Sequence, residues 1–266
     1  MEEKINKSAG RAVDLIEIFV SAGKPLTLSE VMHLSGFPKT SCFELIATLV
    51  KKGILETVEG HVPSYKLGSK LFEISFIAAS KNDLYGAAHP VLKKLSREVG
   101  GTAYLAVRRE NEILYIDKVE SDVPIRSTLA VGSRNNMHTT GLGKAILAAY
   151  SDEKVRDIVG GGALSQKTPY SIKTYVSLIQ DLDKTRRRGY AIDDREDLEF
   201  MRCVAAPIMS AEKKVLGAIS VSMPDSLMPY KRAEEIGQKV KASAMEISKR
   251  MGYAASDLYD INIKFL

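Results

Sequence analysis

The chain has 266 residues, of which 45% are hydrophobic and 27% charged, and its formal net charge is +5. This length favours two domains, and the composition is typical of a soluble globular protein. No run of about 18 apolar residues is present, which excludes an ordinary membrane-spanning helix.

The start of the chain and its cysteines narrow the class of protein further. Residues 1–8 are rich in charge and lack the apolar core of a signal peptide, so we expect a cytoplasmic protein. The two cysteines, Cys42 and Cys203, fall in different predicted domains and cannot form a framework of disulfides. Together with four scattered histidines they match no zinc or haem spacing, so we expect neither a metal nor another cofactor.

Residues 1–67 have the pattern of a winged helix-turn-helix domain. A first helix, capped by Ser8, begins near Ala9 and stops at Gly23. A short second helix and a turn precede a third helix over 38–52, and two short strands then form a hairpin wing. The residues behind these later elements are Thr27 or Ser29 as cap, Val31 and Leu34 facing inward, Gly36-Phe37-Pro38 as the turn, and Ile54–Val58 and Tyr65–Leu67 as the strands.

The third helix is the candidate reading helix, because its inward stripe determines which side chains face solvent. Apolar residues recur from Cys42 to Val50 at helical spacing. Short hydroxyls and a lysine at the helix start suit entry into the major groove, where they can hold phosphates or reach base edges. The residues predicted to contact DNA are Lys39, Thr40, Ser41, Phe43, Glu44 and Thr48 on this helix and Lys66 in the wing.

Charge alone does not identify the first domain as DNA-binding. Residues 1–82 hold ten lysines and arginines against nine aspartates and glutamates, a balance of +1. A small helical domain used for protein contacts therefore remains an alternative at this point.

The rest of the chain predicts an α+β domain. A helix over 68–82 is placed to connect the domains, and another over 83–99 ends at a glycine pair. Runs of strands between helices then indicate an antiparallel sheet. The predicted elements are strands at Thr102–Arg108, Ile113–Val119, Arg126–Val131, Arg202–Met209 and Leu216–Met223, and helices at Gly141–Tyr150, Glu153–Val159, Thr174–Arg188 and Tyr230–Met251.

Taken in order, eight short segments between about residues 8 and 253 resemble the IclR-type transcriptional regulators. Each segment alone is a weak signal, but the ordered set is specific. The segments are Arg11-Ala12, Pro38-Lys39-Thr40-Ser41, Tyr65-Lys66-Leu67-Gly68, Val131-Gly132-Ser133-Arg134, His138-Thr139-Thr140-Gly141-Leu142-Gly143-Lys144-Ala145, Gly189-Tyr190-Ala191-Ile192-Asp193-Asp194, Cys203-Val204-Ala205-Ala206-Pro207 and Ile219-Ser220-Val221-Ser222.

The resemblance implies a domain plan and a set of partners. It implies a winged helix-turn-helix over 1–67, a linker helix over 68–82 and a GAF-like effector domain over 83–253, which leaves 254–266 as a tail. It also implies a homodimer or homotetramer that binds double-stranded operator DNA and responds to a small carboxylate metabolite. The effector-binding residues that it implies are Gly141, Leu142, Asp193, Met201, Cys203, Ser220 and Ser222.

The residue pattern gives this pocket independent but weaker support. Ser220 and Ser222 are two apart on a predicted strand, so their hydroxyls share a face, roughly 7 Å apart. A helix that opens near Thr140 leaves free N–H groups that suit a carboxylate. Each residue also has a plainer interpretation: the serines as cross-strand hydrogen bonding, Cys203 as a small buried hydrophobe and Asp193 as turn chemistry.

One residue departs from the pattern of the family. Glu44 stands in the reading helix where members usually have arginine. A carboxylate repels phosphate but can accept a hydrogen bond from cytosine N4, so we expect an unusual operator. Phosphate anchoring would then depend on Lys39, Lys51, Lys66 and Arg11.

Our interpretation is a DNA-binding regulator controlled by a small organic acid, and repression and activation are equally compatible with the sequence. Two alternatives from other classes are a ligand-sensing protein-interaction module without DNA function and an enzyme that acts on a small acid through Cys203 or His138. A cysteine nucleophile needs a paired base, and the sequence places none beside Cys203. We therefore expect no catalytic residue.

Overall fold

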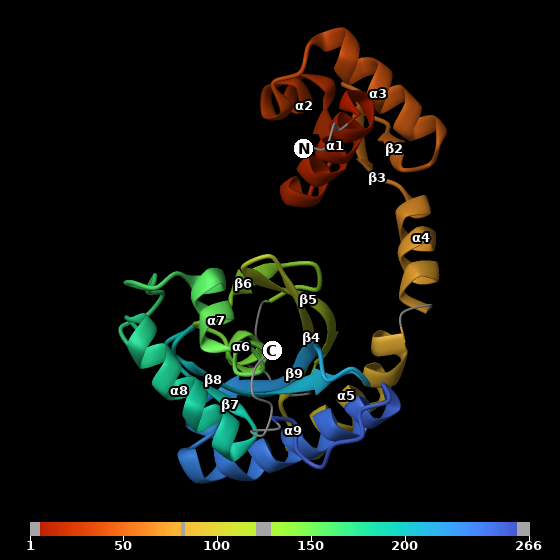
Figure 1. Cartoon of the computed structure of the whole chain (residues 1–266). Coiled ribbons are helices and arrows are strands. Elements are labelled where there is room, and N and C mark those ends of the chain that lie inside the picture. The colour runs from red at the N-terminus through yellow and green to blue at the C-terminus, as the bar shows by residue number, and fades with distance from the viewer. Residues whose placement is uncertain (1–5, 81–82, 121–128, 260–266) are drawn as a thin grey trace. The chain divides into compact units, whose positions relative to one another are not determined.

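The computed structural model describes residues 6–80, 83–120 and 129–259 (Figure 1). The chain divides into two units, Met1–Lys81 and Asn82–Leu266, each with a hydrophobic core of its own. None of the described helices is long and apolar enough to cross a membrane.

The first unit begins with α1, Lys7–Ala22. The Asn6 side chain accepts hydrogen bonds from the backbone N–H groups of Ser8 and Ala9. The cap is therefore Asn6 and not Ser8, because the helix begins earlier than its apolar pattern indicates. Gly23 ends the helix with φ of 60°, in the left-handed region that glycine adopts without steric cost.

Helices α2, Leu28–Ser35, and α3, Lys39–Lys51, form the helix-turn-helix. Thr27 and Glu30 make a capping box at the start of α2, in which each side chain accepts from the other's backbone N–H. Leu34, which the sequence placed inward, is instead 55% exposed. This short helix fills its share of the core with the other three apolar residues, Leu28, Val31 and Met32.

The wing consists of β2, Leu55–Val58, and β3, Ser64–Leu67, which pair antiparallel. A two-residue strand, β1 at Leu26–Thr27, adds to the other edge of β3. The sequence indicated an extended connector there but not this pairing. Helix α4, Ser69–Ser80, follows the wing directly.

The second unit is built on an antiparallel sheet whose described strands have the order β6-β5-β4-β9-β8-β7. Long central strands pair β4 with β9 and β9 with β8, so segments far apart in the chain lie side by side (Figure 1). The strands are β4 (Thr102–Arg109), β5 (Glu112–Val119), β6 (Arg134–Asn136), β7 (Ala191–Asp194), β8 (Met201–Met209) and β9 (Val215–Pro224).

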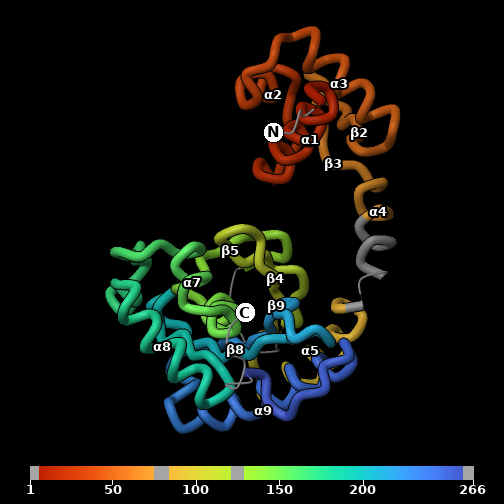
Figure 2. The backbone as a smooth tube through the Cα atoms, in the orientation of Figure 1, coloured from red at the N-terminus to blue at the C-terminus, as the bar shows by residue number. Residues whose placement is uncertain are grey.

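Helices cover both faces of this sheet (Figure 2). Helices α5 (Asp83–Val99) and α9 (Tyr230–Arg250) pack on one face, against Leu105, Ile208 and Ile219 among others. Helices α6 (Gly141–Leu147), α7 (Asp152–Val159) and α8 (Tyr175–Arg188) belong to the core on the other face. Because side chains alternate along a strand, each central strand contributes to both cores.

The structure corrects three expectations in this unit. The strand predicted at 126–131 lies partly outside the described residues, and its described remainder is not a strand; the edge strand is β6, further along. The helix predicted to reach Tyr150 ends at Leu147. Strand β7 was missed, because a four-residue segment that ends in two aspartates has the composition of a turn.

The segment 254–266, for which the sequence offered only a tail, packs onto the domain as far as it is described. Leu258 and Tyr259 are buried, and the Tyr259 hydroxyl donates to the carbonyl of Ala145 in α6 at 2.9 Å. Asp257 pairs with Lys241 of α9 at 3.1 Å. This segment thus connects helices on the two faces of the sheet.

Candidate nucleic-acid interface and effector cavity

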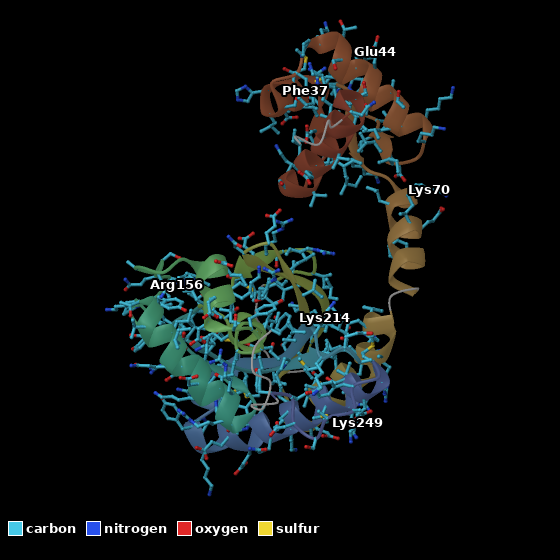
Figure 3. The ribbon with its side chains drawn as sticks, viewed as in Figure 1. Phe37, Glu44, Lys70, Arg156, Lys214 and Lys249 are labelled. Atoms are coloured by element: carbon cyan, nitrogen blue, oxygen red, sulfur yellow. The ribbon has the colours of Figure 1, made fainter. Side chains whose placement is uncertain are left out.

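The outer side of α3 presents the side chains that the sequence assigned to DNA reading. Lys39, Thr40, Glu44 and Thr48 are exposed, and Phe43 is 56% exposed although it is a large apolar residue. Figure 3 shows Glu44 on the outer side of the helix. An exposed phenylalanine on such a helix can contact the methyl group of thymine, and lysine can pair with phosphate.

Ser41 differs from its neighbours because it is half-buried. Its hydroxyl accepts a hydrogen bond from the Arg11 guanidinium at 3.3 Å, and Arg11 also lies 5.0 Å from the centre of the Phe37 ring. Arg11 therefore joins α1 to the turn and to the start of α3. These contacts give Arg11 a structural role in addition to the phosphate anchoring that the sequence predicts for it.

In the wing, Lys66 is exposed and pairs with Glu56 of the neighbouring strand at 3.5 Å. An exposed ion pair of this kind contributes little to stability. The lysine can therefore exchange its partner for a phosphate at small cost.

In the second unit, the seven residues assigned to effector binding all line one cavity between α6 and the sheet. They come from α6, β7, β8 and β9, and the cavity has a volume of about 20 Å³. That is room for about one water molecule, so an organic acid can enter only when apolar side chains in the lining move. The seven are Gly141, Leu142, Asp193, Met201, Cys203, Ser220 and Ser222.

The register of the sheet explains why three of these side chains meet. Cys203 of β8 lies opposite Ser222 of β9, and its thiol donates to the Ser222 hydroxyl at 3.1 Å. Asp193 of β7 lies opposite Cys203 on the other side. The intervening residues of β8 and β9, Val204 and Val221, point to the α5/α9 face and join its apolar core.

The start of α6 closes one side of the cavity. Thr140 caps the helix through a hydrogen bond from the backbone N–H of Gly143 at 3.1 Å. Gly141 packs closely on β8, and a side chain at Gly143 would meet the carbonyl oxygen of Met137 at 2.2 Å. Within the described chain, the N–H groups of Gly141 and Leu142 have no protein acceptor, so both remain open to a ligand.

Asp193 is the most deeply buried carboxyl group in this wall. It is 2% exposed, and its Oδ1 accepts the backbone N–H of Glu196 at 2.7 Å and that of Asp197 at 3.4 Å. Burial raises the pKa of Asp193 to about 8, and the nearby carboxylate of Glu196 adds to the rise. Its carboxyl therefore carries a proton over most of the neutral pH range.

A buried ion network lies behind the cavity. Lys144 of α6 is fully buried and reaches Glu196 at 2.5 Å and Asp181 of α8 at 2.9 Å. Burial opposes its charge, but the two carboxylates outweigh that effect and raise the pKa of Lys144. The Gly-Leu-Gly-Lys segment, which is not a phosphate loop by sequence, thus uses its lysine to fix α6 to its neighbours.

Sequence reasoning missed part of the cavity. The additional lining residues are Tyr104, Tyr115, Leu129, Thr140, Asp197 and Leu198. Tyr104 lies opposite Ser220, but only the pairing of β4 with β9 reveals this, and no local pattern predicts that pairing. Thr140 was detectable in principle as the cap of α6.

The geometry offers no support for the enzyme alternative. Burial raises the pKa of the Cys203 thiol well above its usual value, and the adjacent Asp193 carboxyl opposes thiolate formation further. A nucleophilic cysteine needs the opposite shift. His138, the other residue considered, does not line the cavity, and its Nε2 lies 2.8 Å from the carbonyl oxygen of Ser165.

Comparisons with known proteins agree with both units. Residues 76–249 match a family model described as the bacterial transcriptional regulator IclR C-terminal, and residues 8–59 match the IclR helix-turn-helix domain. The chain belongs to the IclR family of transcriptional regulators. It is a DNA-binding regulator by family, and its relatives are regulators rather than enzymes.

Individual IclR-family relatives cover nearly the whole chain. The transcriptional repressor IclR of Escherichia coli K12 is 30% identical over 92% of this chain and 90% of its own length. The regulator KipR of Bacillus subtilis 168 is 28% identical over 93% of this chain and 98% of its own length.

Solved structures of IclR-type proteins have the same fold. The Thermotoga maritima IclR structure, 26% identical, gives a TM-score of 0.77 over 93% of this chain and 99% of its own. An IclR homologue from Microbacterium hydrocarbonoxydans, 22% identical and complexed with 4-hydroxybenzoate, gives 0.81 over 92% and 98%. At these TM-scores, the helix-turn-helix and the curled antiparallel sheet are those of the family.

Proposed function

We propose that this regulator binds a two-fold operator through α3 and the wing, and that a small organic acid bound between α6 and the sheet changes its operator affinity. The observation that carries the effector part is the convergence of an aspartate, a thiol, two serine hydroxyls and two open N–H groups on one cavity. A concave site with apolar walls and few polar groups is typical of small-molecule binding.

The DNA part rests on the exposed side of α3. The residues we propose for contact are Lys39, Thr40, Ser41, Phe43, Glu44 and Thr48, with Lys66 from the wing. A single reading helix covers only a few base pairs, so useful specificity needs a homodimer or homotetramer on a symmetric site. Several relatives are named repressors, which favours repression here.

The domain limits we propose follow the same division of labour. Residues 1–67 read DNA, 68–82 form the linker helix, 83–253 hold the effector, and 254–266 are a tail whose described part packs on the second unit. The linker helix exposes Phe72 and Ile74, at 73% and 49%, which suits a helix that packs against a second copy.

A thermal-shift series tests the effector part. The full chain is heated with a panel of 2-oxo, hydroxy and aromatic acids, and Ser220→Ala is run beside the wild type. An acid at about 100 times its Kd should add roughly 2.7 kcal/mol of stability. We expect at least one acid to raise the wild-type Tm and to lose that effect in Ser220→Ala.

The matched control is Ser243→Ala, a half-buried serine on α9, on the opposite face of the sheet. It should respond to the acid like the wild type. A wild type that no acid in the panel stabilises would contradict the proposed effector class.

A further inference from the structure

The cavity that we propose for an organic acid is lined by carboxyl groups, which is unexpected for an anionic ligand. Among the described residues that line it, the ionisable carboxyls are Asp193 and Asp197, and no lysine, arginine or histidine is present. An anionic ligand would therefore meet two carboxyl groups and, within the described lining, no cation of its own. Such an arrangement costs free energy unless one carboxyl takes up a proton.

The carboxyls around the cavity differ in their partners. Asp197 accepts from the Lys167 ammonium at 2.7 Å and from the Asn135 amide at 2.9 Å. Glu196 and Asp181 share the ammonium of Lys144. Each of these three carboxylates thus has a cation at contact distance.

Asp193 makes no ion pair with any residue that the structure describes. Its hydrogen bonds come from two backbone N–H groups, and the Cys203 thiol lies beside it. Among the four carboxyls it is the one without an ion pair, and its burial raises its pKa. The ionisable groups that face it are Lys144 from α6, Asp181 from α8 beyond that lysine, Cys203 from β8, Glu196 and Asp197 from the loop after β7, and Tyr115 from β5 across the cavity.

We propose that the cavity binds monocarboxylates together with one proton, which the Asp193 carboxyl holds and donates as a hydrogen bond to the ligand carboxylate. This inference rests on the proposed function and names its ligand class. The open N–H groups of Gly141 and Leu142 and the Ser220 and Ser222 hydroxyls are further donors. A dicarboxylate would add a second charge that none of the described lining residues can neutralise.

The proposal predicts how affinity depends on pH. With a raised folded-state pKa of about 8, Asp193 is neutral at pH 7 and ionised at pH 9.5. Affinity for a monocarboxylate should be constant from about pH 6 to 7.5 and fall about tenfold per pH unit above 8. The dissociation constant at pH 9.5 should then be about 30-fold larger than at pH 7.

Calorimetry of the full chain provides the test, with pyruvate, lactate and benzoate as probes and with lactamide and benzamide as the uncharged counterparts of the last two. Titrations in two buffers of different ionisation enthalpy give the number of protons taken up. We expect uptake to rise from roughly 0.1 at pH 7 to nearly one at pH 9.5, and the amides to bind without it.

Two variants identify the titrating group. Asp193→Asn keeps an Oδ1 acceptor for Glu196 and offers an N–H donor that cannot ionise, so binding should persist and lose its pH dependence. Cys203→Ser removes the thiol as a titrating group, and the pH dependence should remain. A dependence that survives in Asp193→Asn overturns the assignment.

A ligand-free measurement separates this claim from the proposed function. The carboxyl carbon resonance of Asp193, assigned by its loss in Asp193→Asn, should titrate with a midpoint near 8. A midpoint below 5 overturns the proton claim, as does an acid that binds with equal affinity at pH 7 and 9.5. If no probe binds at any pH although the midpoint is near 8, it is the proposed effector function that fails.

Discussion

The two faces of the effector sheet differ in what they bury. On the α5/α9 face the central strands present mainly apolar side chains, among them Leu105, Val204, Ile208 and Ile219. On the α6 face the same strands present Cys203, Ser220 and Ser222, next to buried Asp193, Glu196 and Lys144.

This difference shows how one sheet can separate stability from recognition. Apolar burial on the α5/α9 face stabilises the fold and tolerates conservative change, whereas a buried polar group costs free energy unless it is fully paired. The polar groups buried on the α6 face cost folding free energy, but in a closed site such groups can recognise a ligand. Successive residues of one strand thus alternate between the apolar core and the cavity.

The largest effect should come from breaking the ion network on the α6 face. Lys144→Met leaves the buried carboxylate of Glu196 and the half-buried one of Asp181 without a cation, which costs about 3–5 kcal/mol of stability. Urea unfolding followed by tyrosine fluorescence measures this, since every tyrosine except Tyr65 lies in the second unit.

Two controls sharpen this comparison of faces. Ile208→Ala, on the α5/α9 face, should cost about 2–5 kcal/mol with little dependence on pH. The loss of stability in Lys144→Met should shrink as pH falls. Without the lysine, the carboxyls have a higher pKa in the folded variant than in the unfolded chain, so the folded variant binds more protons and acid stabilises it. Lys154→Met on the exposed side of α7 should stay within about 0.5 kcal/mol. An equal pH dependence at Ile208 and Lys144 would contradict the distinction.

The second comparison is between the two units, and its effects are smaller. Lys39→Ala should weaken binding to all operators and lower the slope of log K against log salt by about one, since one phosphate contact is lost. Glu44→Arg should move the slope the other way and alter which sites are bound in a random-site library.

Gel-shift titrations at several salt concentrations measure both variants. Lys249→Ala, an exposed lysine on α9 that Figure 3 labels, is the matched control and should leave the slope unchanged. A slope in Lys39→Ala equal to that of the wild type would remove this lysine from the interface.

Local periodicity made much of the fold readable from the sequence. The stripe from Cys42 to Val50 located α3 and its solvent face, and the two-residue spacing of Ser220 and Ser222 put both hydroxyls on one face of β9. The helix and strand types follow from the spacing of apolar residues, which neighbours in the chain determine. Ends were less certain, as Asn6 and Leu147 illustrate, because caps depend on single hydrogen bonds.

The remainder depended on contacts between distant segments. The ion pair of Lys144 with Glu196 joins residues 52 positions apart, and no pattern in either segment predicts it. Tyr104 enters the cavity only because β4 pairs with β9, and β7 exists because β8 provides its edge. The family resemblance, more than the spacing of residues, predicted the seven residues that line the cavity.

The most direct test of the account is linkage between the two units. Operator affinity of the full chain is measured by titration with and without a saturating acid from the thermal-shift panel, in wild type and Ser220→Ala. The account predicts a change of about 5–150-fold in the wild type, corresponding to a coupling of roughly 1–3 kcal/mol, and none in the variant. Equal operator affinity with and without an acid that demonstrably binds would contradict it.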